Sequence, residues 1–192
     1  MKRLILASAS PRRRELLANA GFAFEMAPAE VDESYTAGED PAAFAERLAL
    51  AKAAQVAQRF AAKDDVVVLG ADTVVVADGE VLGKPASADD ARAMLRKLSG
   101  IAHRVITGVA LAAPGTSRRA GGHEVTRVYF RPLTEEEIAA YVATGEPLDK
   151  AGAYAAQGQA SRFVTRVEGC YFNVVGLPVA LVDRLLRDWN RD

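Results

Sequence analysis

The segment best suited to bind an anion lies near the N-terminus, where Ser8-Ala9-Ser10-Pro11 is followed by three consecutive arginines. Serine at the N-cap and proline at the first helical position are typical of a helix start. A helix N-terminus has free N–H groups and partial positive charge, so it binds phosphate readily. Arginines in the first turn oppose the helix dipole, at a cost of about 0.3–1 kcal/mol each. Their presence favours a phosphate site at residues 8–14; a plain Ser-Pro cap with surface arginines is the alternative.

A carboxylate follows the most apolar run of the chain. Val66-Val67-Val68-Leu69 is typical of a strand that is buried on both faces, and Gly70-Ala71-Asp72-Thr73 comes directly after it. Open α/β sheets bind their ligands beyond the ends of such strands. Asp72 is therefore a candidate metal ligand or general base, and a turn-capping aspartate is the alternative.

Two later residues could contact other parts of a nucleotide. Lys84 stands between Gly83 and Pro85, which restrict its backbone and suit a point charge aimed at phosphate. Gln157 lies in a Gly- and Ala-rich segment, and its amide could bind a base edge. An exposed loop residue that only faces water is the alternative for both.

Strands and helices alternate along the chain. Strands are predicted at residues 3–7, 66–69, 73–77, 80–82, 103–112, 123–131, 162–168 and 170–175, with Asp78-Gly79 as a hairpin turn. Helices are predicted from Ser10 to Ala20, Pro41 to Ala62, Ser87 to near Gly100, Thr134 to Thr144, and Pro178 to about Trp189. Residues 22–40 are expected to be irregular, and residues 146–161 to form a functional loop. These elements indicate one α/β domain.

Composition excludes several classes of protein. The 192 residues are half hydrophobic, and their formal net charge of −1 argues against a polynucleotide-binding surface. The single cysteine, Cys170, permits no intramolecular disulfide and fits a reducing compartment. There is no apolar run long enough for a secretory signal or a membrane span, so a cytoplasmic protein is expected. Neither a Walker A loop nor a GxGxxG motif is present.

The chain resembles the Maf family of nucleotide pyrophosphatases over nearly its whole length. The resemblance depends on short blocks in a fixed order: Leu-Ala-Ser-Ala-Ser-Pro-Arg-Arg at 6–13, Val-Asp-Glu at 31–33, Ala-Lys-Ala at 51–53, Gly-Ala-Asp-Thr-Val-Val at 70–75, Leu-Gly-Lys-Pro at 82–85, Thr-Gly-Val at 107–109, Asp-Lys-Ala-Gly-Ala-Tyr at 149–154 and Asn-Val-Val-Gly-Leu-Pro at 173–178. Arg14 extends the arginine run where many relatives have another polar residue, which leaves open which arginine contacts phosphate.

The resemblance implies hydrolysis of a nucleoside triphosphate between its α and β phosphates, with Mg²⁺ or Mn²⁺ as cofactor. It implies that Asp72 is the proton acceptor and that Glu33 binds the metal with it. The phosphate-binding residues would be Ser8, Arg13, Lys52 and Lys84. Arg12, Thr73 and Gln157 match the branch acting on dTTP and UTP, including modified pyrimidine nucleotides; a branch acting on 7-methyl-GTP differs at those positions.

The family resemblance also sets the expected architecture and role. It implies a mixed central sheet flanked by helices, with two lobes around a deep cleft, similar to inosine triphosphate pyrophosphatases. A homodimer and a nucleotide-pool cleaning role linked to cell-division arrest are further expectations. The alternatives are a non-catalytic nucleotide-binding regulator of septum formation, a 7-methyl-GTP pyrophosphatase, and a phosphatase that acts on mono- or diphosphates.

Overall fold

A computed structural model describes residues 2–36, 38–61, 63 and 65–191 of the chain. The strands in these residues are β1 (Arg3–Leu6), β2 (Phe24–Met26), β3 (Val66–Ala77), β4 (Glu80–Leu82), β5 (Ala102–Ala112), β6 (Arg119–Phe130) and β7 (Val164–Glu168). The helices are α1 (Pro11–Asn19), α2 (Pro41–Gln58), α3 (Ala88–Leu98), α4 (Glu135–Ala143), α5 (Tyr171–Val175) and α6 (Val179–Trp189), with short 3-10 helices η1 (Glu146–Asp149), η2 (Ala151–Ala153) and η3 (Gln159–Phe163).

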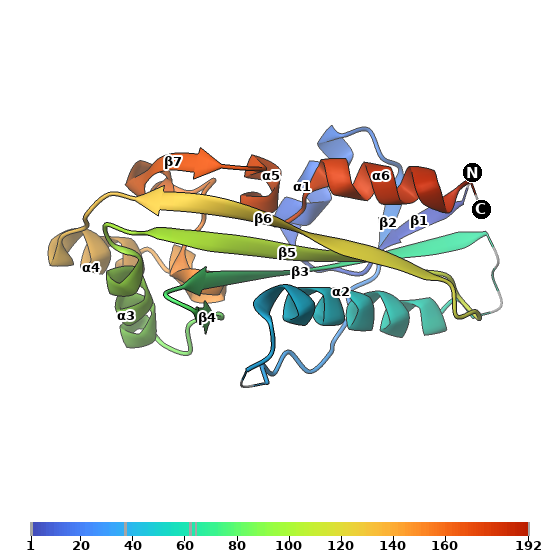
Figure 1. The fold of residues 1–192 in the computed structure, drawn as a ribbon, viewed down its shortest axis with the longest axis horizontal. Helices are drawn as coiled ribbons and strands as arrows, with labels where there is room; N and C mark the ends of the chain where they lie inside the picture. The colour runs from blue at the N-terminus through green and yellow to red at the C-terminus, as the bar shows by residue number, and fades with distance from the viewer. Residues whose placement is uncertain (1, 37, 62, 64, 192) are drawn as a thin grey trace. The chain divides into compact units, whose positions relative to one another are not determined.

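Within the described residues the strands form a seven-stranded sheet in the order β2-β1-β3-β5-β6-β7, with β4 paired to β3. The sheet is mixed, because β1 pairs in parallel with β2 and β3, whereas β3 with β4 and β6 with β7 are antiparallel. Helices lie against its strands (Figure 1). This confirms the predicted mixed sheet flanked by helices.

The chain divides into two compact units, with boundaries inside β3, β5 and β6. Unit 1 consists of residues 1–72, 107–124 and 176–192, and unit 2 of residues 73–106 and 125–175. The prediction that the whole chain is a single domain stays a prediction.

Unit 1 begins with a strand and a capped helix, as the sequence predicts. Ser10 is the N-cap of α1 and Pro11 is in its first turn. At the other end Gly21 has a φ of 80°, and the Phe22 amide donates to the Leu17 carbonyl at 3.1 Å. These are the marks of a Schellman motif, which ends the helix where the sequence predicts. The core of unit 1 includes Ile5, Ala7, Ala53, Val56, Ala57, Val66, Val68 and Ala112.

Unit 2 is built on a hairpin and a second apolar core. Asp78 and Gly79 both have positive φ, 49° and 82°, which confirms the tight turn predicted between β3 and β4. Thr134 and Glu137 form the predicted capping box at the start of α4. The buried members of this core include Leu95, Leu98, Phe130, Ile138, Tyr141, Tyr154 and Phe163.

Several predicted boundaries are wrong. Residues 66–77 form one continuous strand, and residues 24–26 form a short strand inside the segment predicted to be irregular. Residues 171–175 are helical although their apolar, β-branched character favours a strand. Helix α2 ends at Gln58, and the predicted last residue, Ala62, lies outside the described residues.

The predicted strand at 170–175 fails for a tertiary reason. The side chain of Asn173 is buried, and its Nδ2 donates to the Val105 carbonyl and to Thr126 Oγ1, both at 2.9 Å. Thr126 Oγ1 also accepts from the Cys170 amide at 3.1 Å. These contacts with two strands hold the segment in a short helical turn, and such contacts override local strand preference. Among the described residues no helix is both long and apolar enough to cross a membrane.

Candidate active site

The N-terminus of α1 follows directly from β1, as the sequence predicts. The Ala7 amide donates to the Leu69 carbonyl at 2.8 Å, which extends the parallel contact of β1 with β3 and buries Ser8. Ser8 Oγ accepts from the Ser10 amide at 3.2 Å, and Ser10 Oγ accepts from the Arg13 amide at 3.4 Å. No acidic residue occupies the first turn of α1. A positively charged helix end therefore carries two serine side chains.

Arg13 folds back onto this helix end and onto β3. Its Nε donates to the Gly176 carbonyl and its Nη1 to the Ala71 carbonyl, both at 2.8 Å, and Nη1 lies 3.4 Å from Ser8 Oγ. Burial lowers the pKa of Arg13, and the nearby carboxylate of Asp72 opposes that shift. Arg13 thus fixes the backbone on which Asp72 is placed, in addition to any contact with phosphate.

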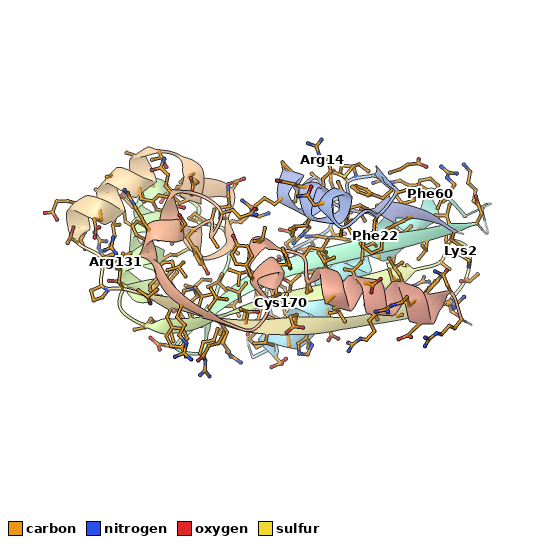
Figure 2. The ribbon with its side chains drawn as sticks, turned by 90° about the horizontal axis from the view of Figure 1, so that it is seen from above. Lys2, Arg14, Phe22, Phe60, Arg131 and Cys170 are labelled. Atoms are coloured by element: carbon orange, nitrogen blue, oxygen red, sulfur yellow. The ribbon has the colours of Figure 1, made fainter. Side chains whose placement is uncertain are left out.

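The other two arginines of the run differ from Arg13. Arg12 is partly exposed, and its positive charge contributes to the lowered pKa of Arg13, so the two guanidinium groups lie near each other. Arg14 is exposed, and Figure 2 shows it pointing outward from α1. In this structure the inward arginine of the run is Arg13.

Helix α2 packs unusually close to β3. A Cβ atom built at Gly70 would lie 2.1 Å from the Ala49 carbonyl oxygen and 2.8 Å from the Ala53 nitrogen. A Cβ at Gly108 would lie 2.3 Å from the Ala45 carbonyl oxygen. Only glycine permits this approach, so the glycines of two sequence blocks bring the alanine face of α2 against the sheet. Lys52 lies on the same face of that helix.

Strand alternation explains why Asp72 faces α2. Side chains two residues apart lie on one face of a strand, so Val66, Val68, Gly70 and Asp72 share a face. Val66 and Val68 pack in the same apolar cluster as Ala53 of α2. The carboxylate of Asp72 therefore continues an apolar row and meets the one lysine of α2.

Lys52 joins the two predicted metal-binding acids. Its Nζ lies 2.6 Å from Asp72 Oδ1 and 2.5 Å from Glu33 Oε1. Lys52 and Asp72 are each 8 % exposed, whereas Glu33 is exposed. Because a buried charge without a partner is strongly unfavourable, this ion pair fixes the position of Asp72.

The loop that carries Glu33 is held by polar side chains of α2 and its C-cap. Gln55 exchanges hydrogen bonds with the backbone of Glu30, and Arg59 Nη1 donates to the Pro28 carbonyl at 2.9 Å. Arg47 pairs with Glu39 at 2.7 Å on the other side of the loop. The sequence reasoning gave these residues no role. Their spacing along one helix, opposite an acidic segment, is the feature of the sequence that could have indicated contacts with this loop.

The remaining predicted site residues belong to unit 2. Thr73 is half-buried in β3, and Lys84 and Gln157 are exposed. The Gly152 amide donates to the Gly83 carbonyl at 3.0 Å, which joins the Lys84 loop to the segment 149–154. The structure thus brings Ser8, Arg13, Glu33, Lys52 and Asp72 together in unit 1. It brings two of the sequence blocks together in unit 2.

The two carboxylates suit a divalent cation that is shared with a substrate. Mg²⁺ is usually held by one or two carboxylates together with substrate phosphates and water. Glu33 and Asp72 both reach a single ammonium nitrogen, so their oxygens face the same small space. No group of three or more His, Cys, Asp or Glu side chains that could hold a metal occurs in the part of the chain that the structure describes. Glu33 and Asp72 therefore fit a divalent cation whose remaining ligands would be phosphate oxygens.

The fold and this cluster define an α/β protein in which a helix N-terminus with two serines and Arg13 lies beside a lysine-bridged pair of carboxylates. The chain belongs to the Maf-like protein family, whose sequence profile matches residues 3–189.

Curated relatives share about half of their residues with this chain. A protein from Pelotomaculum thermopropionicum is 51 % identical, covering 97 % of this chain and 96 % of its own length. Proteins from Koribacter versatilis and Moorella thermoacetica are each 54 % identical, covering 96 % and 97 % of this chain and 93 % and 94 % of their own. All three are named dTTP/UTP pyrophosphatase.

Among solved structures, a nucleoside-triphosphatase / dITP/XTP pyrophosphatase from Mycobacterium abscessus superposes with a TM-score of 0.40 at 15 % identity, covering 68 % of this chain and 75 % of that chain.

Proposed function

We propose that this protein is a nucleoside triphosphate pyrophosphatase that hydrolyses dTTP and UTP to the monophosphate and pyrophosphate. Relatives with that name match it at about half of all positions over nearly the whole chain. Arg12, Thr73 and Gln157, which the family resemblance links to pyrimidine nucleotides, support this substrate over 7-methyl-GTP.

The observation that carries the proposal is the pair Asp72 and Glu33, bridged by Lys52, together with the bond from Arg13 of α1 to the Ala71 carbonyl beside Asp72. Hydrolysis forms a bond between a water oxygen and the α phosphorus and breaks the bond to the bridging oxygen, so pyrophosphate leaves with that electron pair. In this proposal Asp72 accepts the proton of the attacking water. A site for binding alone would need no such base.

The remaining residues provide charge and orientation. In this proposal Ser8, Arg13 and Lys52 bind phosphate. Ser8 and Arg13 contact each other at the N-terminus of α1, and Lys52 pairs with Asp72. Lys84 would stabilise the charge of the departing pyrophosphate. Glu33 and Asp72 would hold Mg²⁺ or Mn²⁺, which supplies charge neutralisation and a lowered pKa of bound water.

The test is a panel of dTTP, UTP, dCTP, GTP and 7-methyl-GTP with Mg²⁺ or Mn²⁺, in which pyrophosphate and orthophosphate are both measured. We expect pyrophosphate from dTTP and UTP. Preferential hydrolysis of GTP derivatives would refute the choice of substrate. Release of orthophosphate would indicate a phosphatase, and binding without turnover would indicate a regulator.

Asp72→Asn tests the role of the base. The variant should remain folded and lose turnover, by about 1,000-fold or more, because the proton acceptor is lost. Asp183→Asn is a matched control, since Asp183 pairs with Arg187 on the surface of α6 in unit 1. Ordinary turnover in Asp72→Asn would refute the assignment.

The proposed setting is the cytoplasm, where the enzyme would remove unwanted pyrimidine nucleotides in connection with cell-division arrest. A homodimer forms part of the same proposal and is tested by sedimentation of the purified protein.

A further inference from the structure

We propose that Tyr141 and Glu146 are positioning residues for nucleotide selectivity, because they fix the turn that carries Gln157. This inference rests on the proposed function, in which Gln157 distinguishes the base. Neither residue belongs to a block that carries the family resemblance.

Gln157 is a central residue of a tight turn. The Gly158 amide donates to the Ala155 carbonyl at 3.0 Å, which closes a four-residue turn over residues 155–158. Gln157 itself is exposed on this turn. The direction in which the side-chain amide of Gln157 points therefore depends on the contacts that fix the two ends of the turn.

The first end is held by a fully buried hydroxyl. The Ala155 amide donates to Tyr141 Oη at 3.2 Å, and Tyr141 Oη donates to Glu146 Oε1 at 2.8 Å. The ring of Tyr141 packs edge-to-face against Phe163, with the ring centroids 5.4 Å apart. This packing fixes the position of the ring that carries the hydroxyl. The position of Ala155 is thereby tied to the core of unit 2.

The second end is held by the carboxylate of Glu146. The Gln159 amide donates to Glu146 Oε1 at 3.1 Å and lies 3.2 Å from Oε2. The Glu146 carboxylate thus accepts hydrogen bonds from both the Tyr141 hydroxyl and the Gln159 backbone amide. Hydrogen bonds to a charged acceptor are roughly twice as strong as those between neutral groups.

Glu146 is itself held in place at the end of α4. Gly145 adopts a left-handed φ of 76°, and the Glu146 amide donates to Thr144 Oγ1 at 3.2 Å. The backbone of Glu146 is therefore fixed before its side chain reaches the turn.

Gly158 completes the arrangement by leaving room for the carboxylate. A Cβ atom at this position would lie 2.1 Å from Glu146 Oε1. The backbone of Gly158, with φ −109° and ψ −154°, is extended and accessible to alanine. Gly158→Ala should therefore displace the carboxylate rather than strain the turn.

The experiment compares Glu146→Ala, Tyr141→Phe and Gly158→Ala with Gln157→Ala. The ratio of kcat/KM for dTTP to that for dCTP should fall about tenfold in each, mainly through a higher KM for dTTP. Glu146→Gln keeps an oxygen acceptor and should restore most of the ratio. Glu135→Ala, which removes a carboxylate of α4 that pairs with Arg96, should leave the ratio unchanged.

A double-mutant cycle separates positioning from general stability. If Glu146 acts through Gln157, Glu146→Ala should change the ratio little further in a Gln157→Ala background, whereas a purely structural effect would persist there. Hydrogen exchange without nucleotide should show faster exchange of the Ala155 and Gln159 amides in Glu146→Ala than in the wild type or in the Glu135→Ala control.

The outcomes distinguish this inference from the proposed function. A wild-type enzyme without preference for dTTP and UTP would overturn both. A selective wild type whose selectivity and amide exchange survive in Glu146→Ala and Tyr141→Phe would overturn the positioning role alone.

Discussion

Replacement of Gly70 by alanine tests whether close packing of α2 on β3 places Lys52 against Asp72. The added Cβ would lie 2.1 Å from the Ala49 carbonyl oxygen, and real Cβ atoms essentially never approach a neighbour below 3.0 Å. The obstructing atoms belong to helix backbone, which cannot rotate away. Helix α2 must therefore retreat by about 1 Å, and such overpacking typically destabilises a protein by about 1–3 kcal/mol.

The same shift should reduce activity. Lys52 Nζ lies 2.6 Å from Asp72 Oδ1, and a retreat of about 1 Å would take that distance past the usual hydrogen-bond range unless the lysine stem follows. Because misplacement of about 1 Å in a site can reduce a rate about 100-fold, we expect kcat/KM for dTTP to fall about 10- to 100-fold.

Urea unfolding and dTTP hydrolysis measure the two effects, and Gly122→Ala is the matched control. A Cβ at Gly122 would meet Leu181 Cδ1 at 3.9 Å, an ordinary contact within the same unit. If Gly70→Ala were as stable and as active as Gly122→Ala, the close-packing argument would be wrong.

Two further substitutions test the buried groups of each unit. Lys52→Met should lower the free energy of unfolding by about 3 kcal/mol, because it leaves Asp72 buried without its partner. Adding Asp72→Asn to this variant should recover part of that loss in urea unfolding. Equal stability of the single and double variants would contradict this. Burial lowers the pKa of His103 to about 4, so between pH 6.5 and 4 the unfolded chain binds a proton that the folded chain does not. The free energy of unfolding should therefore fall by about 3 kcal/mol as the pH is lowered from 6.5 to 4. His103→Gln should remove this part of the dependence of stability on pH. An unchanged dependence in that variant would show that His103 does not titrate in this way.

The helix starts and turns could be predicted because local chemistry determines them. Ser10 with Pro11, Thr134 with Glu137, and Asp78-Gly79 each satisfy nearby backbone groups or supply a needed φ. The short strand β2 could not be predicted from Phe24–Met26, because three residues give no periodicity and the strand depends on pairing with β1.

The site could be predicted in part. A phosphate site over residues 8–14 and the candidate carboxylate Asp72 followed from a helix start and a strand end. The choice of Ser8 and Arg13 within that segment, and the naming of Glu33 and Lys52, came only through the family resemblance. Nothing in the local sequence shows that Lys52 bridges two acids, because that contact depends on how closely Gly70 and Gly108 let α2 approach. The contacts of Arg13 with backbone carbonyls could likewise not be predicted from the sequence, because its partners Ala71 and Gly176 are far from it along the chain.

The charges of the cluster explain why a cation should accompany the substrate. Arg13 and Lys52 carry two positive charges that Glu33 and Asp72 balance, and the nearby Arg12 adds one more positive charge. A triphosphate adds several negative charges next to two carboxylates, which repel it. The partial charge of the α1 N-terminus, equivalent to about half an elementary charge, offsets only part of this excess. Binding should therefore depend on added positive charge. A divalent cation held at the two carboxylates, as we propose, would remove their repulsion of the phosphates and would leave Lys52 able to turn from the acids to the substrate.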